Sequence, residues 1–232
     1  MKGEKIAIIT ARGGSKRIPK KNIKNFCGKP IIAYSIEAAL ESGIFAEVMV
    51  STDSEEIAQI AKNYGAEVPF MRSERTAGDF ATTSDVIMEV IEEYRKRGRE
   101  FDYICCVYPA APFATSETLK AAMKIMEEVN PVEVMPVVQF SYPPQRCLVI
   151  DENQNMGYKY KEYIQSRSQD LEKQYHDAGQ FYIYNTEKYL RLNGNITGGI
   201  RPIIVSDMQV QDIDNEEDWK IAELKYKMLE KD

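Results

Sequence analysis

The chain has 232 residues, a net charge of −6 and 44% apolar residues, which indicates one compact soluble domain with a sizeable core. Residues 1–25 lack the apolar core of a signal peptide, and no run of roughly 18 apolar residues could span a bilayer, so we expect a cytoplasmic protein without membrane partners. The acidic balance argues against a nucleic-acid partner, because such proteins usually carry a broad basic face. The four cysteines lack metal-binding spacing and are expected to be reduced.

The first predicted strand leads into an unusual loop. Residues 5–22, KIAIITARGGSKRIPKKN, place an apolar strand before a loop with two glycines, a serine and five Lys or Arg residues. Gly13 and Gly14 allow backbone angles that turn amides toward one anion. The charge that would neutralise this anion comes from Arg12, Lys16, Arg17 and Lys21. We therefore predict a triphosphate-binding loop, with a solvated surface loop as the alternative.

Two known phosphate-binding patterns do not fit this loop. A P-loop needs Gly-Lys-Ser/Thr at the start of a helix, whereas Ile18 and Pro19 interrupt the run here. A dinucleotide fingerprint needs a third, spaced glycine and an immediate helix. The loop is therefore expected to be long and open.

Beyond the loop, short apolar runs alternate with segments of helical periodicity. This alternation predicts a Rossmann-like, doubly wound α/β fold with a mostly parallel sheet. The predicted elements are a helix over 30–42 ended by Gly43, a strand over 47–52, a helix from Asp53 or Ser54 to Tyr64, an extended segment over 66–70, a helix over 83–97, a buried strand over 103–108, and strands over 132–138, 180–185 and 201–206.

The pattern breaks over residues 139–175, where tyrosines, two prolines and polar residues show little periodicity. Such a stretch inside a compact domain is usually functional. We predict a single domain over 1–232 with an inserted arm at 139–175 that serves dimerisation or the substrate pocket. Within the arm, YKYKEYI at 158–164 alternates like a strand with one aromatic face, and a simple edge hairpin is the alternative.

The second chemical signal is VQDIDNEEDW at 210–219. In an extended segment Asp212 and Asp214 face the same side and can share one hard cation such as Mg²⁺, while Ile213 points into the core. The alternative is that Asp214 or Asn215 only caps the following helix and Asp212 is solvated. Its pairing with a triphosphate-binding loop favours the metal site.

Five motifs occur in a set order: ARGGSKRIPKKN at 11–22, STD at 51–53, YPAAPFAT at 108–115, HDAGQFYI at 176–183 and DIDNEED at 212–218. With these motifs the chain resembles the acylneuraminate (CMP-sialic acid synthetase-like) cytidylyltransferases over nearly its whole length. YHDAGQFYIYN and SYPPQR are most similar to members that act on pseudaminic acid. The resemblance implies a nucleotidyltransferase (glycosyltransferase-A-like) sheet. The aromatic insertion at 139–175 suggests a two-fold homodimer whose arm reaches the pocket of the neighbouring copy.

The resemblance also implies a reaction in which CTP and a nine-carbon acid sugar give a CMP-sugar and pyrophosphate, with Mg²⁺. The anomeric hydroxyl attacks the α-phosphorus in line, and negative charge accumulates on the leaving pyrophosphate. By the family pattern the triphosphate is held by Ala11, Arg12, Gly13, Ser15, Lys16, Lys21 and Asn22, with Arg12, Lys16 and Lys21 as the catalytic groups. Asp212 and Asp214 hold the bridging cation. No general base is assigned.

For the nucleobase, the family pattern points to residues 70–85. The positions that match its cytosine contacts are Arg72, Ala81, Thr82 and Thr83. Alternatively, Arg72 pairs with Glu74 or Asp79 on the surface. Asp53, at the end of a strand, either binds the ligand or caps a helix.

The sugar pocket departs from the sialic-acid pattern, because Tyr108 and Ala114 stand where many relatives carry Gln and Arg. The resemblance assigns the sugar contacts to Tyr108, Arg146, His176, Asp177 and Gln180. Arg146 would bind the sugar carboxylate through two hydrogen bonds. The alternative for His176 is a structural hydrogen-bonding role. The alternatives are the same chemistry on N-acetylneuraminic, legionaminic or 3-deoxy-manno-octulosonic acid, or a nucleotide-binding protein without turnover.

Overall fold

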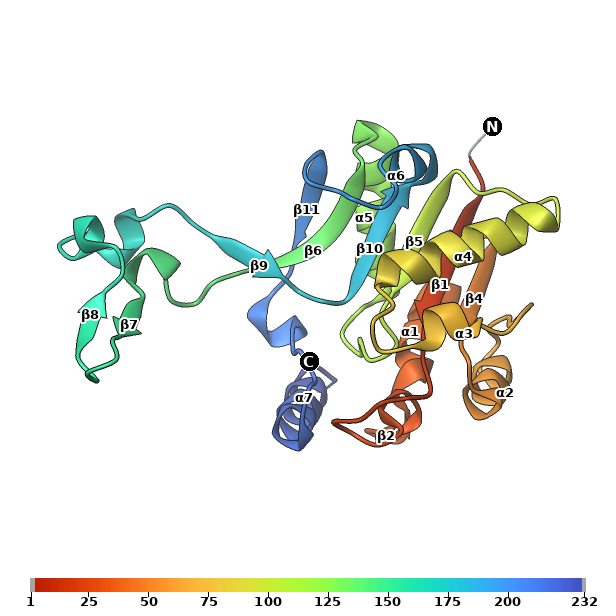
Figure 1. Ribbon diagram of the computed structural model, residues 1–232, viewed down its shortest axis with the longest axis horizontal. Coiled ribbons are helices and arrows are strands. Elements are labelled where there is room, and N and C mark those ends of the chain that lie inside the picture. The colour runs from red at the N-terminus through yellow and green to blue at the C-terminus, as the bar shows by residue number, and fades with distance from the viewer. Residues whose placement is uncertain (1–2, 231–232) are drawn as a thin grey trace.

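A seven-stranded sheet organises the chain, and the computed structural model describes residues 3–230 (Figure 1). The strands of this sheet are β1 (Lys5–Thr10), β4 (Glu47–Ser51), β5 (Tyr103–Val107), β6 (Glu133–Gln139), β9 (Tyr175–Asp177), β10 (Phe181–Asn185) and β11 (Ile200–Ile204). Their order is β11-β6-β10-β5-β1-β4, and β9 pairs with β6. The predicted α/β fold is confirmed.

The sheet is mixed. β1 runs parallel to both β4 and β5, with Ile6 opposite Glu47 on one side and Ile104 on the other. β10 is antiparallel to β5 and to β6, and so interrupts the parallel order. The sequence did not predict this reversal, because FYIYN is as apolar as a parallel strand buried on both faces.

Helices cover both faces of the sheet. The helices are α1 (Ile31–Ser42), α2 (Glu55–Asn63), α3 (Glu74–Ala77), α4 (Thr83–Lys96), α5 (Ser116–Val129), α6 (Thr186–Arg191) and α7 (Glu216–Leu229). α1, α2 and α5 pack on the face that carries Ala7 and Ile9, whereas α4 and α6 pack on the face that carries Ile6 and Ile8. Between residues 3 and 230, no helix has the length and apolar character needed to cross a membrane.

The boundaries predicted for α1, α2, α4 and for β4, β5, β6, β10 and β11 agree with the structure to within one or two residues, because local chemistry sets them. The predicted extended segment over 66–70 does not form a strand, since only Glu67 pairs there, in a single bridge with Met49. Ser54 caps α2, since its side chain accepts a hydrogen bond from Ile57 N, so Asp53 is not the cap. Gly43 ends α1 in the left-handed conformation at φ 62°. Cys105 and Cys106 are fully buried in β5, and all four cysteines are free.

The chain leaves the sheet after β6 and returns at β9, and the intervening arm projects away from the body (Figure 1). The arm contains a hairpin of β7 (Leu148–Ile150) and β8 (Met156–Tyr158). A strand over the whole of 158–164 is therefore wrong, because β8 ends at Tyr158 and a 3₁₀ turn follows at Lys161–Tyr163. The partner strand does not extend further, because the residues before Leu148 form a 3₁₀ turn at Pro144–Arg146.

Candidate active site

The carboxyl ends of three parallel strands define the candidate site. β1 lies between β4 and β5, so the chain segments that follow these strands leave the sheet at the same edge. Open α/β sheets bind ligands at this edge, where the strand order reverses. Here it brings together the loop over 11–22, Asp53 after β4 and Tyr108 after β5.

The loop after β1 is held in shape by its own polar groups. Ser15 Oγ donates to Ile18 O at 2.7 Å, and Asn22 Nδ2 donates to Arg12 O at 2.9 Å. Ala11 N donates to Ser51 O at 3.0 Å, which fixes the loop on β4. Ser15 and Asn22 thus hold the loop's shape in this structure.

The two loop glycines do not use the left-handed angles that the sequence suggested. Of the residues in the loop, Lys20 has a positive φ, at 52°. Gly13 instead makes a close approach, because a Cβ there would lie 3.1 Å from Ser54 Cβ. Its amide donates to Asp53 Oδ1 at 2.8 Å. Asp53 therefore supports the loop after β1, a role that the sequence did not suggest.

The loop meets the DID segment, although the two are far apart in the chain. Lys21 Nζ donates to Ile213 O at 2.7 Å, and Arg17 Nη1 lies 2.5 Å from Asp214 Oδ2. Ile18 and Ile213 are buried in one apolar cluster with Trp219 of α7. The structure therefore brings together the two segments that the sequence assigned to one site.

The DID segment belongs to no helix or strand, and exposure alternates along it as the sequence predicts. Ile213 is buried, whereas Asp212 is exposed and Asp214 is half-buried. Asn215 caps α7, because its Oδ1 accepts from Glu217 N and Asp218 N. Asp214 is therefore not the helix cap, and both aspartates remain available as ligands beside the loop.

Burial is the main influence on the pKa of Lys21. It lowers the pKa of this ammonium from the ordinary value of 10.5, and the charge of Asp214 offsets part of the effect. Lys21 is thus a partly desolvated cation fixed on a carbonyl, the kind of group that stabilises phosphate charge.

The carboxylates suit a cation that shares its coordination with a substrate. Within residues 3–230 no three His, Cys, Asp or Glu side chains cluster closely enough to hold a metal by themselves. Mg²⁺ is usually bound by one or two carboxylates together with substrate phosphates and waters. Asp212 and Asp214 therefore fit Mg²⁺ bound jointly with a nucleotide.

Arg72 is held at the end of β4. Its Nε donates to Ser51 Oγ at 3.1 Å and its Nη2 donates to Ser51 O at 2.6 Å, so it pairs with neither Glu74 nor Asp79. The side chain is buried, which lowers its pKa, and the charge of Asp53 offsets this effect. Arg72 is therefore fixed near the loop rather than mobile on the surface.

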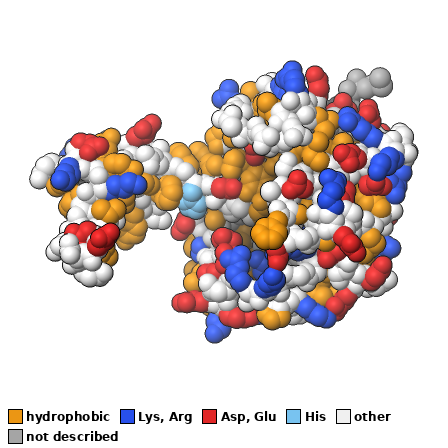
Figure 2. Space-filling model, viewed as in Figure 1, with side chains coloured by type: hydrophobic (Ala, Val, Ile, Leu, Met, Phe, Trp, Pro, Cys, Tyr) orange, Lys and Arg blue, Asp and Glu red, His pale blue; other side chains and the backbone are white. Residues whose placement is uncertain are grey.

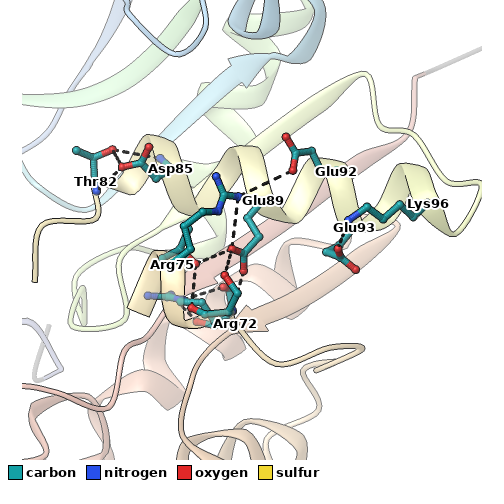
Figure 3. A network of polar contacts seen from close by, with 11 residues as sticks. Arg72, Arg75, Thr82, Asp85, Glu89, Glu92, Glu93 and Lys96 are labelled. Atoms are coloured by element: carbon teal, nitrogen blue, oxygen red, sulfur yellow. Dashed lines mark hydrogen bonds and ion pairs between the residues drawn. The ribbon is translucent and has the colours of Figure 1, made fainter. Parts of the chain in front are cut away.

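The turn after Arg72 is tied to α4 by a buried carboxylate (Figure 3). Glu89 accepts hydrogen bonds from Ser73 N at 2.9 Å, from Ser73 Oγ at 2.5 Å and from Thr76 Oγ1 at 2.8 Å. The sequence reasoning missed Glu89. Its signal is an acid at apolar-stripe spacing from Val86, a position that would otherwise face the core.

The other predicted base contacts lie at the start of α4. Thr82 forms a capping box with Asp85, which engages its hydroxyl and amide. Thr83 lies beside the Tyr108 hydroxyl, and Ala81 closes the preceding turn through Gly78 O. Thr82 therefore caps the start of α4, and Thr83 lies on the side of Tyr108.

Tyr108 and Asp177 lie together on the far side of β5. Tyr182 links them, because its hydroxyl donates to Asp177 Oδ2 at 2.5 Å and its ring lies 5.3 Å from that of Tyr108. Tyr182 was missed, although it lies two residues after Gln180 in the same motif. Gln180 is buried and donates its side-chain amide to Gln209 O, which indicates a structural role.

The other two residues predicted to contact the sugar are His176 and Arg146. His176 is exposed on β9 and its ring lies 4.8 Å from that of Phe140. Arg146 lies in the arm, where its Nη1 donates to Ser168 Oγ at 3.1 Å. Arg146 precedes β7 in the arm, and this arm projects away from the body of its own chain and from β1 (Figure 1).

A cavity of about 890 Å³ lies elsewhere, between α4, α6 and the amino ends of β1 and β5. It opens at the edge of the sheet opposite the loop. Two of its arginines already have acidic partners, Arg95 with Glu100 and Arg99 with Glu47. The chemistry predicted from the motifs is therefore at the exposed carboxyl edge, not in this cavity.

The fold is that of a nucleotidyltransferase. A solved CMP-2-keto-3-deoxy-manno-octonic acid synthetase complexed with CTP is similar with a TM-score of 0.71, over 98% of this chain and 99% of that chain. At 18% identity this likeness shows the fold alone.

The family follows from the sequence. A family model described as Cytidylyltransferase matches residues 6–212, so the chain belongs to the cytidylyltransferase family. The pseudaminic acid cytidylyltransferase of Campylobacter jejuni (serotype O:2) is 40% identical over 224 residues, 96% of each chain. The CMP-N,N'-diacetyllegionaminic acid synthase of Legionella pneumophila is 36% identical over 228 residues, 94% of each chain. The resemblance drawn from the motifs is confirmed.

Proposed function

We propose that this cytidylyltransferase transfers CMP from CTP to pseudaminic acid and releases pyrophosphate. The observation that carries the proposal is the contact between Lys21 and Ile213, which puts the cationic loop and the paired carboxylates on one site. The name of the 40% identical Campylobacter jejuni relative supports pseudaminic acid over other acid sugars. Legionaminic acid is the second candidate, on the name of the 36% identical Legionella relative.

In the proposed reaction the sugar's anomeric hydroxyl attacks the α-phosphorus in line, and charge builds up on the leaving β- and γ-phosphates. We assign the binding of these oxygens to Arg12, Lys16 and Lys21 of the loop. Lys21 is already oriented by Ile213 O, so little reorganisation is needed as the charge develops.

Asp212 and Asp214 would hold Mg²⁺ in this complex. When bound, the ion would act as a Lewis acid that neutralises phosphate charge and orients the triphosphate. Arg17 ion-pairs with Asp214 at 2.5 Å, so it holds this carboxylate beside the loop.

For the nucleobase, we assign Arg72, Ala81 and Thr83. Ser51 engages Nε and Nη2 of Arg72, which leaves Nη1 as the donor that we assign to the nucleotide. For the sugar, we assign Tyr108 and Asp177, with Tyr182 orienting Asp177. His176 remains a predicted sugar contact.

We further propose a homodimer in which the arm completes the sugar site of a second copy. The hairpin exposes Leu148, Val149, Ile150 and Met156, and Figure 2 shows hydrophobic side chains along the arm. Exposed apolar patches of this kind mark interaction sites. A dimer would also explain why Arg146 lies far from the loop of its own chain. Sedimentation of a monomer at micromolar concentration would rule the dimer out.

The proposed substrate is tested by pyrophosphate release from CTP and Mg²⁺ with a panel of pseudaminic, legionaminic, N-acetylneuraminic and 3-deoxy-manno-octulosonic acids. We expect the highest kcat/KM with pseudaminic acid. A higher value with another sugar would reassign the substrate, and no release with any sugar would contradict the proposed activity.

A further inference from the structure

The carboxylate of Asp79 pairs with two of the cationic side chains that we assign to the triphosphate. Arg12 Nη1 lies 2.8 Å from Asp79 Oδ1, and Lys16 Nζ contacts Asp79 Oδ2. Asp79 lies 67 residues from Arg12 in the chain, so this is a tertiary contact between the loop after β1 and the turn between α3 and α4. Its two oxygens bridge the cations as two oxygens of a phosphate would.

The turn that carries Asp79 lies between two anchored segments, and Figure 3 shows the contacts of Glu89 at one anchor and those of Thr82 with Asp85 at the other. On one side, Glu89 holds Ser73 and Thr76 of α3. On the other, the capping box of Thr82 and Asp85 fixes the start of α4. These anchors do not depend on the contact of Asp79 with the loop.

Between the anchors the turn has few contacts. Phe80 is 100% exposed and Gly78 and Asp79 are exposed, while the backbone is closed by one hydrogen bond from Ala81 N to Gly78 O at 3.3 Å. Segments with little burial and few protected hydrogen bonds open at low cost. Asp79 can therefore leave the loop without disturbing α3 or α4.

We propose that Asp79 sets the affinity of the nucleotide site, because its carboxylate holds Arg12 and Lys16 and must be displaced by the β- and γ-phosphates. This inference rests on the proposed function. Hydrogen bonds from Lys16 and then Arg12 lower the pKa of Asp79, so it competes with phosphate as an anion at neutral pH.

The displacement predicts a pattern among ligands. CTP and pyrophosphate must both displace Asp79, so their observed affinities are reduced by the fraction of enzyme in which the carboxylate is bound. CMP carries only the α-phosphate and does not need these two cations. Return of Asp79 to the loop after catalysis would promote the release of pyrophosphate.

Calorimetric binding of pyrophosphate, CTP and CMP to the whole protein with Mg²⁺, without sugar, tests this inference. For Asp79→Asn we expect pyrophosphate and CTP to bind about threefold to tenfold more tightly, and CMP to bind unchanged. Asp79→Ala, which also removes the carboxylate charge, should shift binding in the same direction. Unchanged or weaker pyrophosphate binding in both variants overturns the inference, and weaker binding would make Asp79 a ligand-binding group.

Glu56→Gln is the matched control. Glu56 ion-pairs with Lys20 of the same loop, and its side chain is 53% exposed, against 44% for Asp79. The Glu56→Gln variant removes the same charge but leaves Arg12 and Lys16 paired with Asp79, so we expect the affinities for pyrophosphate and CTP to change less than about twofold. An equal effect of both variants would show general electrostatics and contradict a specific displacement.

This binding test is independent of turnover. Tighter pyrophosphate binding in Asp79→Asn supports the displacement even if no sugar in the panel is converted, and the proposed function then fails alone. Conversion of pseudaminic acid with unchanged binding in Asp79→Asn would leave the proposed function intact and overturn the role of Asp79.

Discussion

Lys21 donates its side-chain hydrogen bond to the main-chain carbonyl of Ile213 at 2.7 Å, across 192 residues of sequence. The ion pair of Arg17 with Asp214 and the packing of Ile18 on Ile213 reinforce the same junction. The loop after β1 therefore owes its shape to the C-terminal segment as much as to its own residues. The two parts form a single candidate CTP clamp.

The first prediction concerns the pH dependence of Lys21. Burial lowers its pKa from 10.5, so its charge is lost at a lower pH than that of an ordinary lysine as the pH rises. We expect the alkaline limb of kcat/KM for CTP to fall below pH 10.5 in the natural protein and to move upward in Lys21→Arg, which stays charged. Identical limbs would show that another group titrates.

The second prediction compares the two loop glycines. A Cβ at Gly13 would press on Ser54 Cβ at 3.1 Å, whereas a Cβ at Gly14 would meet no atom within 4 Å. We expect Gly13→Ala to shift the amide that binds Asp53 and to raise KM for CTP about tenfold, because small displacements of a binding loop are costly. Gly14→Ala is the control and should change KM little. Equal effects would contradict the close-approach argument.

The third prediction concerns Glu89, which three hydrogen bonds join to the turn at Ser73 and Thr76. Removing this buried acceptor leaves its donors unsatisfied, so Glu89→Ala should lower the free energy of unfolding by about 2–4 kcal/mol in urea titrations. Glu92→Ala is the control. Its exposed carboxylate pairs with Arg75 at 3.9 Å and should contribute less than about 0.5 kcal/mol.

Glu89 also gives a pH test of stability. Burial alone would raise its pKa, but hydrogen bonds from Ser73 and Thr76 lower it below 4.5. A carboxylate with a depressed pKa stabilises the fold above its unfolded-state pKa, and this contribution is lost as the pH falls through the folded-state value. The stability gap between the natural protein and Glu89→Ala should therefore narrow below pH 4.5. A constant gap would contradict an ionised Glu89.

The fourth prediction concerns Glu133, whose ionisation should destabilise the fold, whereas that of Glu89 stabilises it. Burial, with a smaller contribution from Asp177, raises the pKa of Glu133 to about 7. Ionisation therefore destabilises the fold as the pH rises from 4.5 through 7. Glu133→Gln should be more stable than the natural protein at pH 8 by about 2 kcal/mol, with little difference at pH 4. A difference independent of pH would contradict the raised pKa.

The elements of the fold were predictable wherever local chemistry determines them. The helix end at Gly43 and the strand at Cys105–Cys106 needed only turn residues and apolar periodicity. The antiparallel entry of β10 was not predictable, because strand direction depends on which neighbours it meets and not on its own composition. The arm misled the prediction since the tyrosine alternation at 158–164 lacks a partner strand beyond Tyr158.

The candidate site likewise contains residues that the sequence predicts and residues that only the tertiary structure reveals. The loop and the DID pair were visible because each carries its chemistry within a few residues. The sequence predicts Asp53 as a ligand-binding residue or a helix cap and Asp79 only as a partner of Arg72, and none of its motifs includes Glu89. The contacts they make depend on tertiary proximity across 40, 67 and 16 residues. Their carboxylates meet the site through folding, which sequence spacing does not reveal.

The central claim is that the loop and the DID segment act on the same triphosphate, and a double-mutant cycle tests it most directly. The cycle measures kcat/KM for CTP in the natural protein, Lys21→Met, Asp214→Asn and the double variant. We expect each single variant to lose at least about a hundredfold and the double variant to lose little more, because groups that act as a unit are strongly non-additive. Multiplicative losses in the double variant, or full activity in either single variant, would contradict the claim.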